Sequence, residues 1–158
     1  ITAYDSGRCD AYTAGVGALA GQRAKLKTPE DHVILTQPIS NDPQGPVTRW
    51  GDERWQLIVR WVLNGMIAAE ALGVTSKNVD DMKANSKNSE VRRLLGAEGG
   101  FGAMMGLSND WMYNAIKQVG NYGESFERTV GMGSNLKMER GQNQLWIKGG
   151  LLFTPPFQ

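Results

Sequence analysis

The order of apolar and polar positions divides the chain into short elements separated by glycine-rich and proline-rich connections. Residues 8–13 alternate, with Cys9, Ala11 and Thr13 on one side, which predicts a strand. A helix is expected over 16–26, and the apolar run 32–35 predicts a short buried strand. The segment 37–46 contains three prolines and is expected to be a loop.

The longest helix is predicted between residues 53 and 72. Asp52 is a good N-cap, because its carboxylate accepts hydrogen bonds from free backbone N–H groups, and Gly73 suits the left-handed position after the helix. A single apolar stripe runs along the helix and predicts one buried face. The stripe consists of Trp55, Ile58, Val59, Val62, Met66 and Ile67.

The rest of the chain is predicted to be mainly helical. Short helices are expected to begin near Asn78 and to cover 89–95, and a longer helix capped by Ser108 is expected over 109–131. Gly120 and Gly123 fall inside that helix and weaken it by about 1 kcal/mol each relative to alanine. A last short helix over 141–148 should end at Gly149, before an extended tail.

The composition is that of a folded domain close to neutrality. The chain has 158 residues, 41% of them apolar, which fits one domain or one domain with a piece of another. Its net charge of +1 leaves no electrostatic footprint for nucleic acid, so no nucleic-acid partner is expected. It has no signal peptide and no apolar run of about 18 residues, and it begins directly in a strand-like pattern, so we expect an upstream segment.

A glycine-rich turn lies between the first predicted strand and the first predicted helix. Residues Gly15 to Ala20 fit G-x-G-x-x-G/A, in which glycines let the backbone approach a pyrophosphate at a helix N-terminus. That function needs an acidic residue after the second strand. Glu30 and Asp31 precede the predicted strand 32–35 instead. A bend that only starts a helix is the simpler interpretation, and a nucleotide-binding enzyme is an alternative.

No pattern of side chains indicates catalysis or a metal site. His32 is the single histidine, no nucleophile motif is present, and metal-ligand spacing is absent, so we expect no catalytic residue, no metal and no cofactor. Cys9 is the single cysteine. It is either a small buried apolar side chain or one half of a disulfide whose other half lies outside this chain.

The order of several longer blocks resembles one family. These blocks are GRCDAYT, DHVIL, NDPQGPVTRWGDERW, VGNYGESFERTVG and LKMERGQNQLWIKGGLLFTPPFQ. Together they resemble the general L-amino-acid solute-binding proteins of bacterial ABC importers, over nearly the whole chain. The resemblance implies an α/β fold of the type II periplasmic-binding class, in which a ligand binds between two lobes. It also implies a periplasmic protein made with a signal peptide in its precursor.

The resemblance also assigns parts of the chain to the two lobes. Residues 1–44 resemble the end of the second lobe, and residues 45–51 resemble the hinge crossing between lobes. Residues 52–158 resemble the C-terminal helices of the first lobe and a C-terminal extension. The chain is thus expected to be a helix-rich C-terminal portion of the fold, with most of the first lobe and the start of the second lobe missing.

The expected ligand site lies at the turn. In the family, a strand like CDAYT leads to an aspartate two positions after the threonine, and its carboxylate holds the α-ammonium of the amino acid. The alignment puts Gly15 at this position, and Thr13 is a further expected ligand contact. Family members carry a second cysteine upstream, so the resemblance implies that Cys9 is half of a disulfide and that the protein is extracytoplasmic.

Three functions follow from these observations. The first is the solute-binding component of an importer for L-amino acids, or a fragment of one, with an ABC permease as partner and no enzymatic activity. The second is a non-binding interaction or remnant module, which packs against the missing N-terminal portion or a second copy of the chain. The third is an enzyme that binds a nucleotide at Gly15–Ala20.

Overall fold

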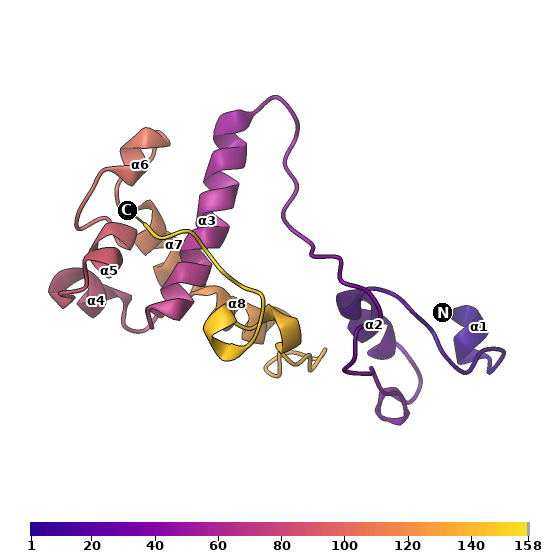
Figure 1. The fold of residues 1–158 in the computed structure, drawn as a ribbon. Helices are drawn as coiled ribbons and strands as arrows, with labels where there is room; N and C mark the ends of the chain where they lie inside the picture. The colour runs from indigo at the N-terminus through magenta and orange to yellow at the C-terminus, as the bar shows by residue number, and fades with distance from the viewer. Residues whose placement is uncertain (158) are drawn as a thin grey trace. The chain divides into compact units, whose positions relative to one another are not determined.

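The computed structural model describes residues 1–157, which form helices joined by long loops (Figure 1). The chain separates into two compact units. The first unit is Ile1–Asp42 with Glu127–Gly141, and the second is Pro43–Phe126 with Gln142–Gln158. The α-helices are α1 (Thr2–Asp5), α2 (Val16–Arg23), α3 (Glu53–Ala71), α4 (Val79–Asn85), α5 (Ser89–Leu94), α6 (Phe101–Met104), α7 (Trp111–Val119) and α8 (Tyr122–Thr129). Short 3₁₀ turns are η1 (Pro29–Asp31), η2 (Gly141–Asn143) and η3 (Trp146–Lys148).

The first unit has very little core. Ala20 on α2 is its one fully buried apolar side chain among the described residues. Polar contacts hold the unit together instead. Arg23 donates to the carbonyl of Leu136 at 3.3 Å, and the Tyr4 hydroxyl is hydrogen-bonded to Nδ1 of His32 at 2.6 Å. Because apolar burial is the main term that offsets chain entropy, this unit depends on further contacts for its stability.

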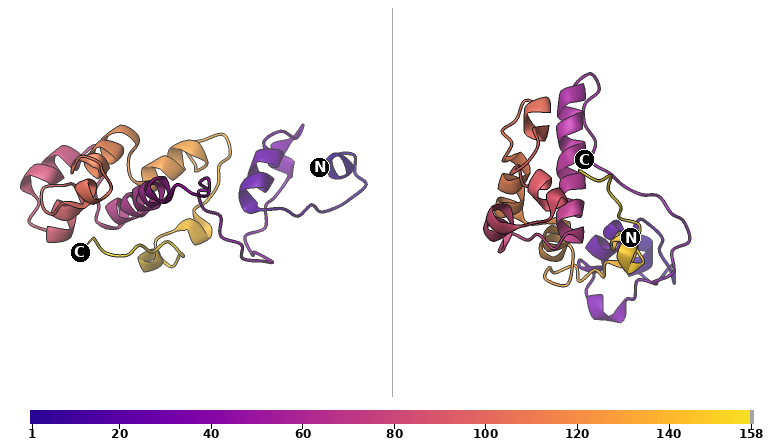
Figure 2. Two further views of the ribbon diagram at one scale, coloured as in Figure 1. Left: turned by 90° about the horizontal axis from the view of Figure 1, so that it is seen from above. Right: turned by 60° about the vertical axis from the view of Figure 1, so that its left-hand side comes forward.

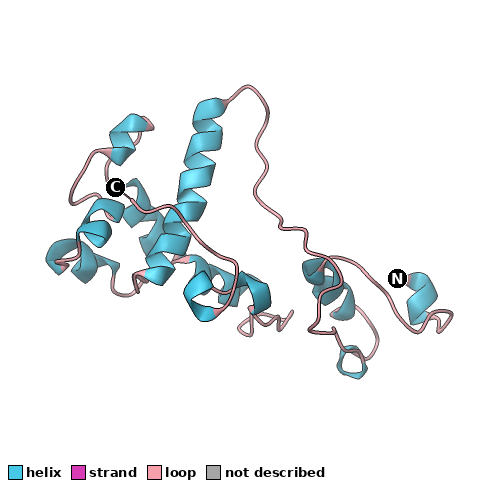
Figure 3. Ribbon diagram, in the orientation of Figure 1, coloured by secondary structure: helices cyan, strands magenta, loops and turns pink. Residues whose placement is uncertain are grey.

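The two predicted strands do not form, so those predictions are wrong for this chain. Residues 8–13 and 32–35 are irregular, and no strand is drawn among the described residues (Figure 3). The β-type pairing found within residues 1–157 is one isolated bridge between Leu145 and Leu152. Val33 and Leu35 are each 81% exposed. A strand needs a neighbour that pairs with its N–H and C=O groups. Local alternation predicts a strand without showing whether that neighbour is in the same chain.

The second unit packs around the long helix α3. Helices α4, α5 and α7 lie on one side of α3 (Figure 2). Gly65 on α3 allows α7 to come close, because a Cβ at that position would lie 2.2 Å from the sulfur of the buried Met112. The buried cluster consists of Ala68, Ala69, Val74, Val79, Val91, Leu94, Leu95, Met112, Ile116 and Phe157.

Both predicted ends of α3 are confirmed. The Asp52 side chain accepts from the backbone N–H of Trp55 at 2.9 Å. After the helix, Gly73 takes a positive φ of +70°. Its N–H donates to the Glu70 carbonyl at 3.2 Å, and the N–H of the next residue, Val74, donates to the Ala69 carbonyl at 2.8 Å. This pair of bonds is the Schellman motif, which satisfies the last carbonyls of the helix.

The single helix predicted over 109–131 is wrong, because the chain breaks between α7 and α8. Gly120 has φ +82° and ends α7. Ser108 does not cap α7, which has Asp110 at its N-cap position. The helix predicted over 141–148 is replaced by η2 and η3, although Gly149 ends that segment in the left-handed conformation as expected. The shorter helices predicted at 16–26, near Asn78 and at 89–95 are confirmed as α2, α4 and α5.

The C-terminal tail crosses α3 and ends in the core of the second unit (Figure 1). The Phe157 ring is 3% exposed and packs edge-on against Trp61 of α3, with 5.2 Å between ring centroids. Its carbonyl accepts from Arg93 of α5 at 3.3 Å. None of the described helices is long and apolar enough to cross a membrane.

Candidate functional site

The predicted ligand turn lies in the first unit, immediately before α2. Thr13 and Gly15 are both exposed. Gly15 is the N-cap residue of α2, and its carbonyl accepts the first helical hydrogen bond from Leu19 at 2.9 Å. Its backbone has φ −59° and ψ 142°, values that any residue adopts, and a Cβ there would meet no atom within 4 Å. The position therefore accepts an acidic side chain without strain.

The nucleotide-binding alternative uses the same turn. The helix of the fingerprint is present as α2, and Ala20 is fully buried, as its last position requires for close packing. The strand before the turn is not formed among the described residues. The structure therefore supplies the helical half of the motif's context and lacks the strand half.

Cys9 lies exposed a few residues before the turn and has a free thiol. The interpretation as a small buried apolar side chain is therefore wrong for this structure. No second cysteine exists in the chain to pair with it. Within residues 1–157, no group of three or more His, Cys, Asp and Glu side chains is arranged to hold a metal ion.

The VGNYGE block forms a capping arrangement at the start of α8. The Asn121 side chain accepts from the N–H of Glu124 at 2.9 Å, while the Glu124 carboxylate accepts from the N–H of Asn121 at 2.8 Å. This is a reciprocal capping box at the start of α8. The same carboxylate accepts from the Ser76 hydroxyl at 2.7 Å, and Asn121 donates to the Val74 carbonyl at 2.8 Å. The block therefore joins α8 to the loop after α3.

We expect the Glu124→Gln substitution to destabilise the chain by about 2 kcal/mol, because hydrogen bonds to a charged group contribute more than neutral ones. Urea unfolding followed by circular dichroism measures the change. Glu90→Gln on α5 is the control, because Glu90 is half-exposed and its side chain holds no comparable set of donors. Equal stability of the Glu124→Gln chain and the wild-type chain would show that the negative charge of Glu124 contributes nothing, since glutamine can still accept from the N–H of Asn121.

A charged network lies on the exposed faces of α4 and α7. Lys117 donates to the two Asp80 carboxylate oxygens at 2.8 and 3.1 Å, and the Tyr113 hydroxyl donates to Asp80 at 2.6 Å. Lys83 pairs with Asp110 at 2.7 Å beside it. The hydrogen bond from Lys117, followed by that from Tyr113, lowers the pKa of Asp80 from its ordinary 3.8. The same bond to Asp80 raises the pKa of Lys117 above its ordinary 10.5.

This network predicts a small pH-dependent contribution to stability. Since the Asp80 pKa is lowered in the folded state, its contribution is complete above pH 3.8 and is lost as pH falls through the folded pKa. We therefore expect wild type to exceed Asp80→Asn in stability at pH 7, and the difference to disappear in strong acid. Thermal melts across pH measure this, with Asp81→Asn as control on the same helix. A difference that is the same at neutral pH and in strong acid would contradict the assignment.

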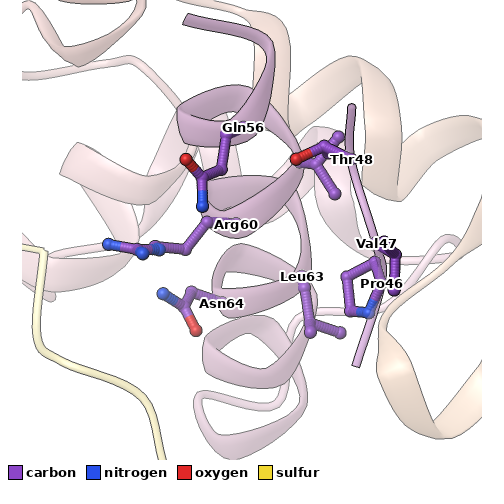
Figure 4. A pocket seen from close by; sticks show the side chains of 8 residues that line it. Pro46, Val47, Thr48, Gln56, Arg60, Leu63 and Asn64 are labelled. Atoms are coloured by element: carbon purple, nitrogen blue, oxygen red, sulfur yellow. The ribbon is translucent and has the colours of Figure 1, made fainter. Parts of the chain in front are cut away.

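Each unit has an open cavity lined by its own described residues. The first has a volume of about 480 Å³ and lies in the first unit, where Arg23, Glu30, His32 and Lys137 give it a mixed charge. The second has a volume of about 380 Å³ and lies in the second unit between residues 46–48 and α3 (Figure 4). We call it the linker slot. It is lined by Pro46, Val47, Thr48, Gln56, Val59, Arg60, Leu63 and Asn64.

The fold is that of part of a periplasmic binding protein. The chain superposes with a TM-score of 0.89 and 50% identity on an ABC transporter periplasmic binding protein from Brucella ovis with glutathione bound. It covers 49% of that protein, while 99% of the present chain is matched. No protein-family model matches the chain.

Named relatives give the same result. The chain is 51% identical over 156 residues to the general L-amino acid-binding periplasmic protein AapJ of Rhizobium johnstonii and covers 46% of it. It is 44% identical over 155 residues to the glutamate/glutamine/aspartate/asparagine-binding protein BztA of Rhodobacter capsulatus, again covering 46%. The resemblance found in the sequence is confirmed: the chain is homologous to about half of a periplasmic amino-acid-binding protein of ABC transporters.

Proposed function

We propose that this chain is part of the extracytoplasmic solute-binding component of an ABC importer for L-amino acids. The observation that carries the proposal is 51% identity to AapJ across 98% of the chain, together with a shared backbone at TM-score 0.89 with a periplasmic binding protein. In this function the protein performs no catalysis. It binds a ligand between two lobes, closes, and presents the ligand to a membrane permease.

The ligand cleft requires groups that this chain does not contain. The first unit, which carries Thr13 and Gly15, buries almost none of its apolar residues, and Val33 and Leu35 are each 81% exposed. The relatives are about twice as long as the matched region. We infer that residues 1–44 end the second lobe, 45–51 cross the hinge, and 52–158 belong to the first lobe, the rest of both lobes being supplied by the portion outside the match.

Cys9 fits the same proposal. Its exposed thiol stands in a segment whose expected strand has no neighbour among the described residues. A cysteine on an adjacent strand of the second lobe would form a disulfide with it in the oxidising periplasm. Thiol titration before and after reduction tests this in a longer protein that contains both this chain and the portion outside the match. A Cys9 thiol that is already free before reduction would contradict the proposed disulfide.

A chimera tests the ligand class. In it, the 156 matched residues of AapJ are replaced by this chain. A thermal-shift panel of the twenty amino acids, with glutathione added because the Brucella ovis protein holds it, is expected to show stabilisation by at least one L-amino acid. AapJ itself is the positive control. A folded chimera that responds to none of these compounds would overturn the proposal.

One observation favours a second candidate function, the non-binding remnant module. Gly15 offers no carboxylate for an ammonium group, although the resemblance implies one at this position. If the chimera folds and binds nothing, while the chimera carrying Gly15→Asp does bind, this chain belongs to a protein that has lost its ligand and kept its fold.

A further inference from the structure

The ligand turn is attached to a helix that has few contacts of its own. Helix α2 begins after its N-cap residue Gly15 and ends at Arg23, and it belongs to the unit that has very little core. Ala20 is its one fully buried residue. Arg23 follows three positions later, which places both side chains on one face of the helix. The contacts of this face therefore decide the direction in which α2 points.

Arg23 connects this face to a segment far away in sequence. Its guanidinium donates to the carbonyl of Leu136 at 3.3 Å, across 113 positions of the chain. Among the described residues, this is the one hydrogen bond made by a side chain of α2. The end of α2 and residues 135–137 line the same open cavity, so side-chain packing does not fill the space between them. The bond from Arg23 is therefore the main direct link at this place.

The segment that accepts this bond is held in shape by its own contacts. We call residues 130–138 the anchor loop, because a backbone hydrogen bond of 3.0 Å joins its two end residues. Within the loop, the Ser134 hydroxyl donates to the Gly131 carbonyl at 2.8 Å and accepts from the N–H of Leu136 at 3.1 Å. The two bonds of Ser134 therefore help to fix the position of Leu136, whose carbonyl is the acceptor.

The backbone of Lys137 indicates that this loop shape is specified. Lys137 has φ +51°, a left-handed conformation that residues with a Cβ rarely adopt. Its ammonium group donates to the Met132 carbonyl at 3.0 Å within the same loop. A strained residue persists only where the surrounding contacts determine its conformation. Because Lys137 comes directly after Leu136, the strain lies at the point where the loop meets α2.

We propose that Arg23 is a positioning residue for ligand binding, which holds α2 on the anchor loop and so fixes the place of the ligand turn. Helix α2 has eight residues and is about 12 Å long, so a tilt of about 5° about its C-terminal end moves Gly15 by about 1 Å. Groups that contact a ligand must be held within about 0.5 Å. The inference rests on the proposed function, and it adds a role for a residue at the opposite end of the helix from the turn.

Hydrogen exchange of the α2 amides tests the contact in the chain itself. With Arg23→Gln we expect the amides of residues 20–23 to exchange about 10-fold faster, because loss of a hydrogen bond from a charged donor raises the population in which α2 is detached. Arg8→Gln is the matched control, since Arg8 is exposed in the same unit and its side chain bonds locally, to the Ser6 hydroxyl at 3.3 Å. Amides that are already unprotected in the wild-type chain, or equally protected in both variants, would overturn the proposal.

Ser134→Ala tests the anchor loop without changing α2. The substitution removes the two hydrogen bonds that help to place Leu136. We expect the α2 amides to exchange faster, by a smaller factor than with Arg23→Gln, because the acceptor is displaced and the donor is kept. Ser6→Ala is the control, since it also removes a hydroxyl that donates to a backbone carbonyl of this unit, at 3.1 Å. Equal exchange in the two serine variants would remove the anchor loop from the proposal.

Affinity for the amino acid separates positioning from stability. In the AapJ chimera, or in its Gly15→Asp form, Arg23→Gln is expected to raise the Kd about 10-fold at a temperature where the chimera stays folded. Arg23→Lys can still donate to the Leu136 carbonyl and is expected to restore most of the affinity. Arg8→Gln should leave the Kd unchanged. Isothermal titration measures all three, and a Kd unaffected by Arg23→Gln would overturn the positioning role even where α2 exchanges faster.

The two proposals fail in different ways in this design. If Arg23→Gln speeds exchange of α2 but the folded chimera and its Gly15→Asp form bind no amino acid, the contact with the anchor loop is kept, and the proposed function is lost together with the positioning role. If the chimera binds an amino acid with the same Kd in the presence and absence of Arg23, the function is kept and only the positioning role is lost.

Discussion

Replacing Gly15 with aspartate in the AapJ chimera is expected to raise affinity for its L-amino acid by roughly 30-fold to several-thousand-fold. A buried charge partner contributes about 2–5 kcal/mol at such interfaces, and each 1.4 kcal/mol is about tenfold in affinity. The structure can accommodate the aspartate without other changes. Gly15 has φ −59°, and a Cβ there meets nothing within 4 Å, so the carboxylate is added without strain. Isothermal titration before and after the substitution measures the gain.

Gly17→Asp is the matched control for this experiment. Gly17 lies two residues further on, in the first turn of α2, and a Cβ there also meets no atom within 4 Å. Both substitutions add the same charge at the same helix N-terminus, where an acidic group stabilises the helix by about 0.3–1 kcal/mol. An equal gain from Gly17→Asp would show that general charge causes the effect, and no gain from Gly15→Asp would remove this position from the ligand site.

Substituting Gly96 with alanine is expected to lower the stability of the isolated chain by about 3 kcal/mol. Gly96 ends α5 with φ +75°, a conformation that costs an alanine about 1–2 kcal/mol. Its Cβ would also lie 2.1 Å from the backbone carbonyl oxygen of Asn109, just before α7. Backbone moves less readily than a side chain, so the clash adds about 1–3 kcal/mol. Urea unfolding with a constant slope measures the sum.

Gly73→Ala separates the two causes. Gly73 ends α3 with φ +70° and the same Schellman bonds, but a Cβ there meets no atom within 4 Å. We therefore expect this control to lose about 1 kcal/mol, for the backbone conformation alone. Equal losses in the two variants would show that the contact with Asn109 has no energetic role.

The sequence predicts this fold well where structure is determined locally. Asp52 and Gly73 lie next to the helix they bound, and the apolar stripe of α3 repeats at the helical period, so its limits could be predicted within a residue or two. The break at Gly120 was not predicted, although it follows from the capping box that pairs Asn121 with Glu124. The pattern N-x-x-E marks this box in a sequence, and it predicts a new helix start there.

The strands and the ligand site depend on groups far away in sequence. Residues 32–35 have strand composition, but their pairing partner is not among the described residues, and no local pattern reveals that. The roles of Thr13 and Gly15 as ligand contacts remain predictions for the same reason. The structure shows both residues exposed and Gly15 free of steric constraint, which establishes that the turn is accessible. Under the proposed function, the groups that would complete a binding site lie outside the chain.

The edge-on contact between Phe157 and Trp61 makes the chain's own fluorescence a reporter of how its tail is seated. Trp50 and Trp55 are 98% and 53% exposed, so they emit largely as indoles in water, whereas Trp146 packs edge-on against Phe153 of the tail. Trp61 is half-buried beneath Phe157, which is itself 3% exposed. A shift of emission to longer wavelength that arises before the helices melt, and hence before the half-buried Trp111 of α7 is exposed, therefore signals release of the tail from α3, with no added dye.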